Sequence, residues 1–490
     1  MAGKRRLALD DLFKMKAVGR VAISPDGQRI VFELTRFDLK KNKNFTQLML
    51  VEAERGPARP ARPLTDGEQS DSRPKWSPDG SRLAFISNRE KASCLYVLPM
   101  DGGEPKRITT RDGNVRDFDF SPNGRRLAYT WQPMTDRQKL ERDGKADTVA
   151  TQPQYKHITR LFHKLDGAGY WNGQYTHVWV ISADGGKPKQ LTRGNYDDRE
   201  PRFSPNGKLI SFVSNRLDDP DRDWDQSDIF VVKPAGGPIR RVTRATGYCD
   251  SHSWSPDGAA IAFVGSPCRP RQWYKHDDHL WIVSAGGGKP RELTRGIDKQ
   301  CTNSTGGDVV SAAYDTSPPI WSGDSTRVFF QVSEQGATRV YSVRAGGGRR
   351  DPHCIIGGDL NVMRMQRTAR EGPLALVIGH ATNPADVHVA DLSVTPAKTA
   401  RLSDVNRRLL SQVDLTQPER FTVKSGRATI EGWVIKPPGF RKGRNYPAIL
   451  EIHGGPESQY GHAFYHELHW LAAKDYVVVY ANPRGSSGYG

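Results

Sequence analysis

The sequence WSPDGSRLAFIS (residues 76–87) decides the fold, because it joins a tight-turn signal to a short apolar strand and recurs along the chain. Proline fixes φ at the second position of such a turn, Asp or Asn tolerates the bend, and glycine takes the positive φ that closes it. Each copy precedes a run rich in Val, Ile and aromatic residues, which predicts a strand. Further copies are ISPDG (23–27), FSPNG (120–124), FSPNG (203–207), WSPDG (254–258) and a degraded WSGDS (321–325).

A second apolar run follows most of these turns and ends in a glycine-rich bend and a Leu-Thr, Ile-Thr or Val-Thr pair. Each unit therefore offers several short antiparallel strands, which is typical of one blade of a β-propeller. A last unit at 374–404 lacks the turn motif but keeps two strand-like runs, LALVIG and DVHVADL. Counting it predicts an all-β, seven-bladed β-propeller, whereas six blades result if this pair is a linker hairpin. The second runs are LYVLPMDGGEPKRIT (95–109), VWVISADGGKPKQLT (178–192), IFVVKPAGGPIRRVT (229–243) and LWIVSAGGGKPRELT (280–294).

The longest insertion between these strands runs from about Trp131 to His177. It contains a charged stretch, DRQKLERDGKADT, and then an aromatic one, ITRLFHKLDGAGYWNGQYTHVW. A long loop of a propeller is either a solvated connection or a functional one, and the sequence leaves both open.

Composition places the chain among globular proteins, with 36% hydrophobic and 26% charged residues. The net charge is +17, but acidic residues are interspersed among the basic ones, so we expect no nucleic-acid partner. No apolar run of about 18 residues exists, so we expect no membrane partner. The first residues, MAGKRRLALDDLFKMKAVGR, lack the apolar stretch of a signal peptide, and the predicted localisation is cytoplasmic.

Neither a disulfide framework nor a metal site is expected from the cysteines. They are odd in number, widely spaced, and form no Cys-x-x-Cys pair. The five are Cys94, Cys249, Cys268, Cys301 and Cys354.

The pattern changes after Asp404. We expect an N-terminal segment at 1–20, the propeller at 21–405, and the incomplete start of an α/β-hydrolase domain at 406–490. The last region begins with a predicted hairpin at 421–440, followed by a nearly continuous apolar strand at 446–453, which we expect to be buried on both faces of a parallel sheet. A helix at about 462–474 and a second buried strand at 476–480 follow.

The tripeptide His453-Gly454-Gly455 ends the first of these strands and has a use in acyl transfer. Glycines carry no Cβ, so a substrate carbonyl can approach the backbone, and their N–H groups can donate to the oxyanion that forms on attack. These three residues are the candidate oxyanion and substrate-binding site, with Gly455 N–H as the first choice of donor and Gly454 N–H as the second. The competing interpretation is a plain turn from strand to loop.

Three segments near the end resemble the start of the catalytic domain of the prolyl oligopeptidase family of serine peptidases: HGGP (453–456), LAAKDY (471–476) and NPRGSSGYG (482–490). They are most similar to its acylaminoacyl-peptidase and dipeptidyl-peptidase-5-like branch. DLFKMKAVGRVAISPDGQRIVFE (11–33) resembles the same branch. The resemblance implies a propeller followed by an α/β-hydrolase domain, a Ser-His-Asp mechanism, peptide substrates and no cofactor.

One part of the family pattern is missing. The nucleophile of the family sits in a Gly-x-Ser-x-Gly turn, and the sequence contains none, since Gly485-Ser-Ser-Gly is followed by Tyr489. No catalytic residue is therefore assigned within this chain, and the resemblance implies that the triad lies beyond Gly490.

His462, His466 and His469 recur at helical spacing and would share one face of the predicted helix. A zinc site is conceivable there, but His466-Glu-Leu-His469 is not the His-Glu-x-x-His pattern. We expect exposed helix histidines and no metal.

Two functional hypotheses follow. In the first, the chain is part of a serine peptidase that hydrolyses short peptides, is inactive alone, and uses its propeller to gate substrate size. In the second, it is a non-catalytic propeller that serves as an interaction module, with a vestigial hydrolase remnant.

Overall fold

The structure, a computed structural model, describes residues 4–54, 60–145, 155, 157–165, 169–244, 247–267, 277–309, 316–347, 352–368, 371–455 and 457–490. The chain forms two compact units. The first comprises Met1–Ser70, Asp277–Leu280 and Leu293–Gly490, and the second comprises Asp71–His276 and Trp281–Glu292. Each is described by itself.

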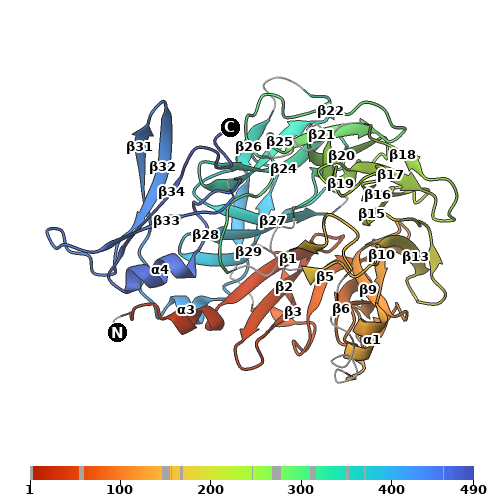
Figure 1. The fold of residues 1–490 in the computed structure, drawn as a ribbon, viewed down its shortest axis with the longest axis horizontal. Helices are drawn as coiled ribbons and strands as arrows, with labels where there is room; N and C mark the ends of the chain where they lie inside the picture. The colour runs from red at the N-terminus through yellow and green to blue at the C-terminus, as the bar shows by residue number, and fades with distance from the viewer. Residues whose placement is uncertain are drawn as a thin grey trace. The chain divides into compact units, whose positions relative to one another are not determined.

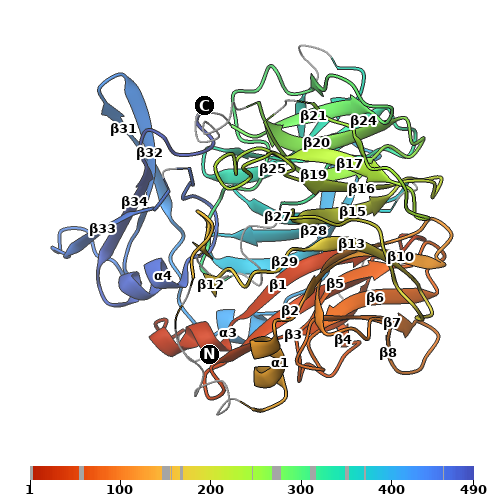
Figure 2. The same ribbon diagram turned by 45° about the vertical axis from the view of Figure 1, so that its right-hand side comes forward.

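The second unit contains a series of four-stranded antiparallel sheets (Figure 2). Apolar side chains fill the space between neighbouring sheets, as in the cluster of Leu95, Phe118 and Tyr129. One sheet holds β5 (Asp71–Trp76), β6 (Arg82–Ser87), β7 (Cys94–Pro99) and β8 (Lys106–Arg107). The next holds β9 (Gly113–Phe120), β10 (Arg126–Pro133), β13 (His177–Ser182) and β14 (Lys189–Gln190). A third holds β15 (Asp198–Phe203), β16 (Ile210–Ser214), β17 (Asp228–Val232) and β18 (Arg240–Arg241). The last holds β19 (Tyr248–Trp254), β20 (Ala260–Ser266), β21 (His279–Ser284) and β22 (Arg291–Glu292).

The first unit contains sheets of the same kind. The sheet β1–β4 packs against the group β27–β30 through buried residues such as Phe32, Val377 and Val387. A single residue pair, Thr338 with Asn361, joins β25 to β27. The strands are β1 (Lys16–Ile23), β2 (Arg29–Asp38), β3 (Lys43–Glu52), β4 (Arg62–Pro63), β23 (Ile320–Trp321), β24 (Arg327–Glu334), β25 (Ala337–Arg344), β26 (His353–Ile356), β27 (Asn361–Arg367), β28 (Leu374–His380), β29 (Asn383–Asp391) and β30 (Lys398–Arg401).

The repeated turn is held by the serine that the sequence motif supplies. At residues 76–80, the Ser77 hydroxyl donates to Asp79 Oδ1 at 2.5 Å and accepts the backbone N–H of Arg82 at 2.9 Å. Gly80 takes φ +73° and donates its N–H to Ser77 O at 2.9 Å. Ser77 is fully buried, so these bonds are shielded from water. The same serine-to-Asp or serine-to-Asn bond forms at Ser121, Ser204, Ser255 and Ser322.

The insertion between β10 and β13 contains α1 (Asp136–Arg142), β11 (Lys164–Leu165) and β12 (Gly169–Tyr170). Thr135 caps α1 by accepting the backbone N–H of Gln138. Residues 146–154, 156 and 166–168 of the insertion lie outside the described residues. Its predicted role therefore remains a prediction.

The C-terminal sheet has the order β31–β32–β34–β33, with β33 parallel to β34 and the other pairs antiparallel. Helix α4 packs on one face through Leu468 and Ala472, against Trp433, Val478 and Tyr480. The short helix α3 precedes this sheet. The bounds are α3 (Arg407–Leu410), β31 (Glu419–Ser425), β32 (Ala428–Ile435), β33 (Ala448–Ile452), α4 (His466–Ala473) and β34 (Val477–Asn482).

The expected burial of the first apolar strand on both faces is wrong. Leu450 is 62% exposed and Ile452 is 70% exposed. β33 is an edge strand that pairs only with β34, and no element in the described residues covers the face that carries these two side chains. An apolar run shows that a strand is suited to burial, but neighbours decide whether it is buried.

The expected helix is also shorter than predicted, because α4 begins four residues later, at His466. The preceding residues 461–465 are irregular, and His462 N–H donates to Gly336 O at 2.8 Å. The Asp308 carboxylate then accepts the backbone N–H groups of His466 at 2.7 Å and Glu467 at 2.9 Å. A distant side chain thus caps the helix and fixes where it starts.

The N-terminal segment packs beside the C-terminal elements (Figure 1). Its 3₁₀ helix η1 (Leu9–Lys14) is flanked by Leu7 and Met15, which share a buried cluster with Phe464. Arg6 donates to Asp475 at 2.8 Å and to Ala473 O at 2.9 Å. Residues from the two ends of the sequence therefore form one local core.

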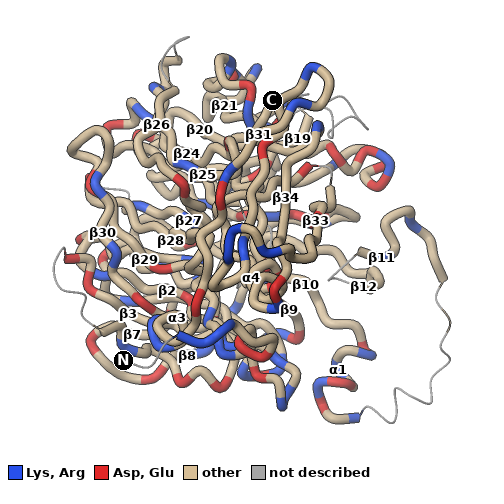
Figure 3. The backbone as a smooth tube through the Cα atoms, turned by 90° about the vertical axis from the view of Figure 1, so that its left-hand side faces the viewer, with Lys and Arg blue, Asp and Glu red and all other residues tan. Residues whose placement is uncertain are grey.

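The charged side chains and the cysteines are distributed along the whole chain. Lys and Arg are interspersed with Asp and Glu along the backbone (Figure 3). Within the described residues, Cys94, Cys249, Cys301 and Cys354 are free thiols, and Cys268 lies outside them. No helix in the described part of the chain is long and apolar enough to cross a membrane.

Replacing the serine of one turn tests how strongly it supports its sheet. We expect Ser77→Ala to lower the free energy of unfolding by about 1–2 kcal/mol, because the backbone N–H of Arg82 loses its hydrogen bond to the buried Ser77 hydroxyl. Equilibrium urea unfolding measures the change. Thr110→Ala, which removes an exposed hydroxyl, is the control, and equal effects of the two substitutions would contradict the role given to Ser77.

Candidate active-site loop

The candidate site lies at the carboxyl ends of the two parallel strands. β33 and β34 run in register from Ala448 opposite Val477 to Ile452 opposite Ala481. Residues 453–461, the site loop, therefore leave the sheet beside residues 483–490. Ser487 N–H donates to Ser458 O at 3.0 Å, which ties the two segments together. Ligand sites of α/β sheets lie at this edge.

His453 bridges the two segments. Its Nε2 lies 2.8 Å from Ser486 Oγ, and its Nδ1 lies 2.8 Å from Gly454 O. Nδ1 faces a carbonyl oxygen and therefore donates to Gly454 O, while the single proton of the Ser486 hydroxyl is donated to Pro483 O. Tyr460 packs edge-on against the imidazole, with ring centroids 5.3 Å apart.

This Ser-His pair does not have the surroundings of a catalytic dyad. Nδ1 faces a backbone carbonyl, and no carboxylate of a described residue forms an ion pair with His453. Ser486 is only 4% exposed, and its Oγ also lies 2.7 Å from Pro483 O. The pair fixes the position of the loop rather than presenting a nucleophile.

The two glycines of the site loop differ in what they require. Gly455 has φ +134°, and a Cβ there would lie 2.6 Å from Glu457 N, so the backbone itself demands glycine. A Cβ on Gly454 would meet nothing within 4 Å. Both residues are exposed, and neither N–H donates a hydrogen bond to another described residue. The loop thus presents two available backbone donors beside open space.

Gln459 attaches the site loop to the β24–β25 hairpin. Its fully buried side chain donates to Thr305 Oγ1 at 2.6 Å and Ala337 O at 3.1 Å, and accepts Gly336 N–H at 3.2 Å. Gly336 lies at the tip of the β24–β25 hairpin, in the first unit. A Cβ on Gly461 would lie 1.8 Å from Gly336 O, so the site loop and the hairpin tip touch backbone to backbone.

Asn482 supports the other side of the loop. Its side-chain amide accepts Tyr460 N–H at 2.8 Å and donates to Tyr460 O at 2.9 Å, as a strand neighbour would. It also donates to the Tyr489 hydroxyl, which donates to Glu431. Burial, together with the hydrogen bond to Glu431, raises the pKa of Tyr489. Sequence reasoning missed Gln459 and Asn482 as supports, and an amide at the end of a buried strand was the one available signal for Asn482.

The three histidines are buried, contrary to the expected exposure. His462 Nε2 lies 3.4 Å from Asp359, His466 Nε2 lies 3.1 Å from Ala8 O, and His469 Nε2 lies 2.7 Å from Ala381 O. Each histidine faces a different partner, and His462 lies before the start of the helix. Burial lowers the pKa of His469 to about 4 and also lowers that of His462. In the described part of the chain, no group of His, Cys, Asp or Glu side chains is arranged to hold a metal.

Known peptidases share this architecture. Residues 14–155 match the family described as the TolB beta propeller domain. The uncharacterized peptidase YuxL of Bacillus subtilis is 28% identical over 505 residues, covering 99% of this chain and 72% of that protein. Dipeptidyl-peptidase 5 of Porphyromonas gingivalis is 24% identical, covering 97% of this chain and 67% of that protein. Pyrococcus horikoshii acylaminoacyl peptidase superposes with a TM-score of 0.76 at 21% identity, covering 99% of this chain and 68% of that one. The chain is thus similar in sequence and fold to peptidases of the prolyl oligopeptidase family.

The chain combines a β-propeller with similarity to peptidases, which confirms those parts of the sequence prediction. The family match at 14–155 runs from the end of η1 into the insertion after α1. The site loop lies well outside that match. Its assignment therefore depends on the geometry of β33, β34 and the hairpin tip.

Replacing Gln459, which anchors the site loop, tests that geometry. We expect Gln459→Leu to lower the free energy of unfolding by about 2–3 kcal/mol, because partners of the buried amide are left without hydrogen bonds. Thermal and urea unfolding measure the loss. Gln28→Leu is the matched control, since the Gln28 side chain is exposed. A Gln459→Leu protein as stable as Gln28→Leu would show that the anchor is dispensable.

Proposed function

We propose that this chain is the propeller and oxyanion-binding part of a serine-type peptidase that hydrolyses short peptides through an acyl-enzyme intermediate. The observation that carries the proposal is the loop His453-Gly454-Gly455, which ends a strand of a parallel pair and offers backbone N–H groups beside open space. The peptidase relatives and the acylaminoacyl peptidase fold support it.

The proposed chemistry assigns each residue a step. A serine oxygen attacks the scissile carbonyl carbon, and the carbonyl oxygen becomes an oxyanion. The Gly455 N–H, with Gly454 N–H as the second choice, donates to that oxyanion. Collapse of the tetrahedral intermediate expels the amine and leaves an acyl-enzyme, which water then hydrolyses. His453 shapes the site by holding the loop against Ser486.

The nucleophile is not assigned to any serine of these 490 residues, because no Gly-x-Ser-x-Gly turn exists among them. We expect residues 1–490 alone to remain unlabelled by a fluorophosphonate probe. The same residues joined to a nucleophile-bearing hydrolase segment should be labelled stoichiometrically. Labelling is read by in-gel fluorescence or intact mass.

Either of two results would overturn this assignment. Stoichiometric labelling of residues 1–490 alone would place the nucleophile within them. A joined protein that binds no probe, although folded, would instead favour the non-catalytic interaction module.

Adding a methyl group at Gly454 tests whether the site loop binds an oxyanion or is a plain turn. In the joined enzyme, we expect Gly454→Ala to lower kcat/KM by about tenfold or more, because the methyl occupies the space into which the substrate carbonyl must move. The melting temperature should stay unchanged, since that Cβ meets no neighbour within 4 Å. Gly426→Ala is the control. It changes a turn glycine between β31 and β32, where no site is proposed, and kcat/KM should stay unchanged. Unchanged activity in Gly454→Ala would refute the oxyanion site.

The proposal also assigns a role to the propeller, for which we propose seven blades. A ring of small sheets encloses a narrow channel, whereas an extended peptide is one strand wide, about 5 Å in the sheet direction. We propose that the propeller admits peptides and excludes folded proteins, with the insertion at 131–177 contacting substrates at the entrance.

Size selection is tested with one cleavable sequence in two forms. We expect the joined enzyme to cleave it as a short peptide and to cleave it far more slowly when it is embedded in a folded protein. Deleting the propeller from a variant that still folds should reduce the difference. Similar kcat/KM values for the two forms in the joined enzyme would rule out gating.

A further inference from the structure

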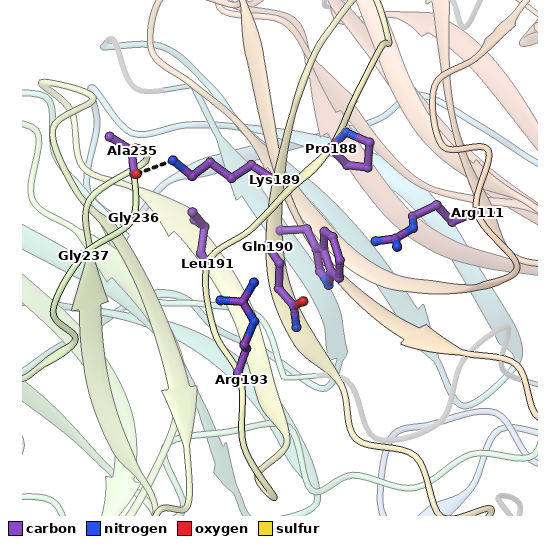
Figure 4. A pocket seen from close by; sticks show the side chains of 10 residues that line it. Arg111, Pro188, Lys189, Gln190, Leu191, Arg193, Ala235, Gly236 and Gly237 are labelled. Atoms are coloured by element: carbon purple, nitrogen blue, oxygen red, sulfur yellow. Dashed lines mark hydrogen bonds between the residues drawn. The ribbon is translucent and has the colours of Figure 1, made fainter.

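A basic recess lies in the second unit, between two neighbouring sheets. It has a volume of about 630 Å³ and is lined by β14, by the segment before β9, and by the turn between β17 and β18. Figure 4 shows Arg111 on one side of Gln190, with Lys189 reaching toward Ala235 on the other and Arg193 below. A smaller recess of about 280 Å³ shares Arg111, Trp179 and Gln190 with it.

Three cations line the larger recess, and none of them has an acidic partner within 4 Å among the described residues. Lys189 Nζ donates to Ala235 O at 2.5 Å, which uses one of its three N–H groups. The acid next to Arg111 in sequence, Asp112, is engaged by Arg142 at 2.5 Å. Three cations that line one recess without an acidic partner among the described residues give this surface a local positive charge.

Arg111 is held in place by aromatic rings rather than by an acid. Its guanidinium carbon lies 4.6 Å from the ring centroid of Trp179 and 5.4 Å from that of Trp131. The two indoles pack edge to face, with centroids 5.5 Å apart, and Trp179 is only 7% exposed. Cation–π contacts fix the guanidinium but use none of its N–H donors. Arg111 is therefore positioned in advance, and its N–H groups donate no hydrogen bond to another described residue.

We propose that this recess binds a small polyanion bearing phosphate or carboxylate groups. Arg111 forms the bidentate contact with one oxyanion group, and Arg193 and Lys189 neutralise further negative charge. A planar guanidinium matches the oxygens of both groups, which is why the shared chemistry is an oxyanion. The volume falls within the range of roughly 300–1,000 Å³ that small-molecule sites occupy.

The proposal does not depend on peptidase activity, because its readout is binding. Titration calorimetry on the 490-residue chain uses pyrophosphate in one arm and citrate in the other. We expect saturable binding of one ligand per chain, weakened as NaCl is raised. Tighter binding of pyrophosphate assigns a phosphate ester, tighter binding of citrate assigns a polycarboxylate, and either supports the proposal.

Substitutions locate the binding. We expect Arg111→Gln and Arg193→Gln each to weaken affinity by about tenfold or more, through loss of charge-assisted hydrogen bonds. Arg111→Lys keeps the charge but loses the planar fork, so it should weaken affinity several-fold. Arg125→Gln removes the same charge from an exposed arginine of the same unit and should leave affinity unchanged. Melting temperatures verify that all four variants are folded.

Any of three results would overturn the proposal: no saturable binding of either anion, an affinity that does not depend on salt, or an equal loss of affinity in Arg125→Gln and Arg111→Gln. Unchanged affinity in Arg111→Lys would remove Arg111 as the bidentate ligand.

Discussion

The site loop depends on a contact that leaves no room for a side chain. Gly336, at the tip of the β24–β25 hairpin, and Gly461, at the end of the site loop, meet backbone to backbone. A Cβ on Gly336 would also lie 2.5 Å from Trp433, at the centre of the C-terminal sheet. Because the glycines meet so closely, Gln459 can bond to the hairpin with its buried amide. Any movement of the hairpin is therefore passed directly to the loop that carries Gly454 and Gly455.

This arrangement gives the site loop three attachments. Gln459 attaches it to the hairpin, while Asn482 pairs with both backbone groups of Tyr460. His453 adds a third attachment through Ser486. The supported residues surround a stretch that is itself exposed, which is the combination a binding site requires: a free backbone on a rigid frame.

The repeat was predictable because its chemistry is local. Ser77, Asp79 and Gly80 are close in sequence and form the turn by hydrogen bonding to one another and to Arg82. The motif alone therefore suffices to predict the turn. The adjoining strands follow from period-two apolar patterns. The seven-blade count and the domain boundaries are still predictions from the sequence.

The supports of the site were not predictable for the opposite reason. Gln459 bonds to a residue 123 positions away, and nothing in its own neighbourhood indicates that an amide there is buried. The start of α4 depends on Asp308, which is equally remote. The burial of His469 and the exposure of Leu450 were both misjudged, because residue type gives a preference while the surrounding elements decide the outcome. The positions of His453, Gly454 and Gly455 at a strand end were predictable, because the strand pattern is local.

The packing of η1 against α4 has a consequence for the order of events during synthesis. His466 Nε2 contacts Ala8 O, and Arg6 donates to Asp475. Residues synthesised first therefore find their partners more than 450 positions later in the chain. The ribosome adds about 5–20 residues per second, so Leu7 and Met15 stay without their apolar partners for tens of seconds. A nascent chain must carry this exposed segment until α4 emerges. We therefore expect chaperone contact at the N-terminus to end only when translation has passed residue 475.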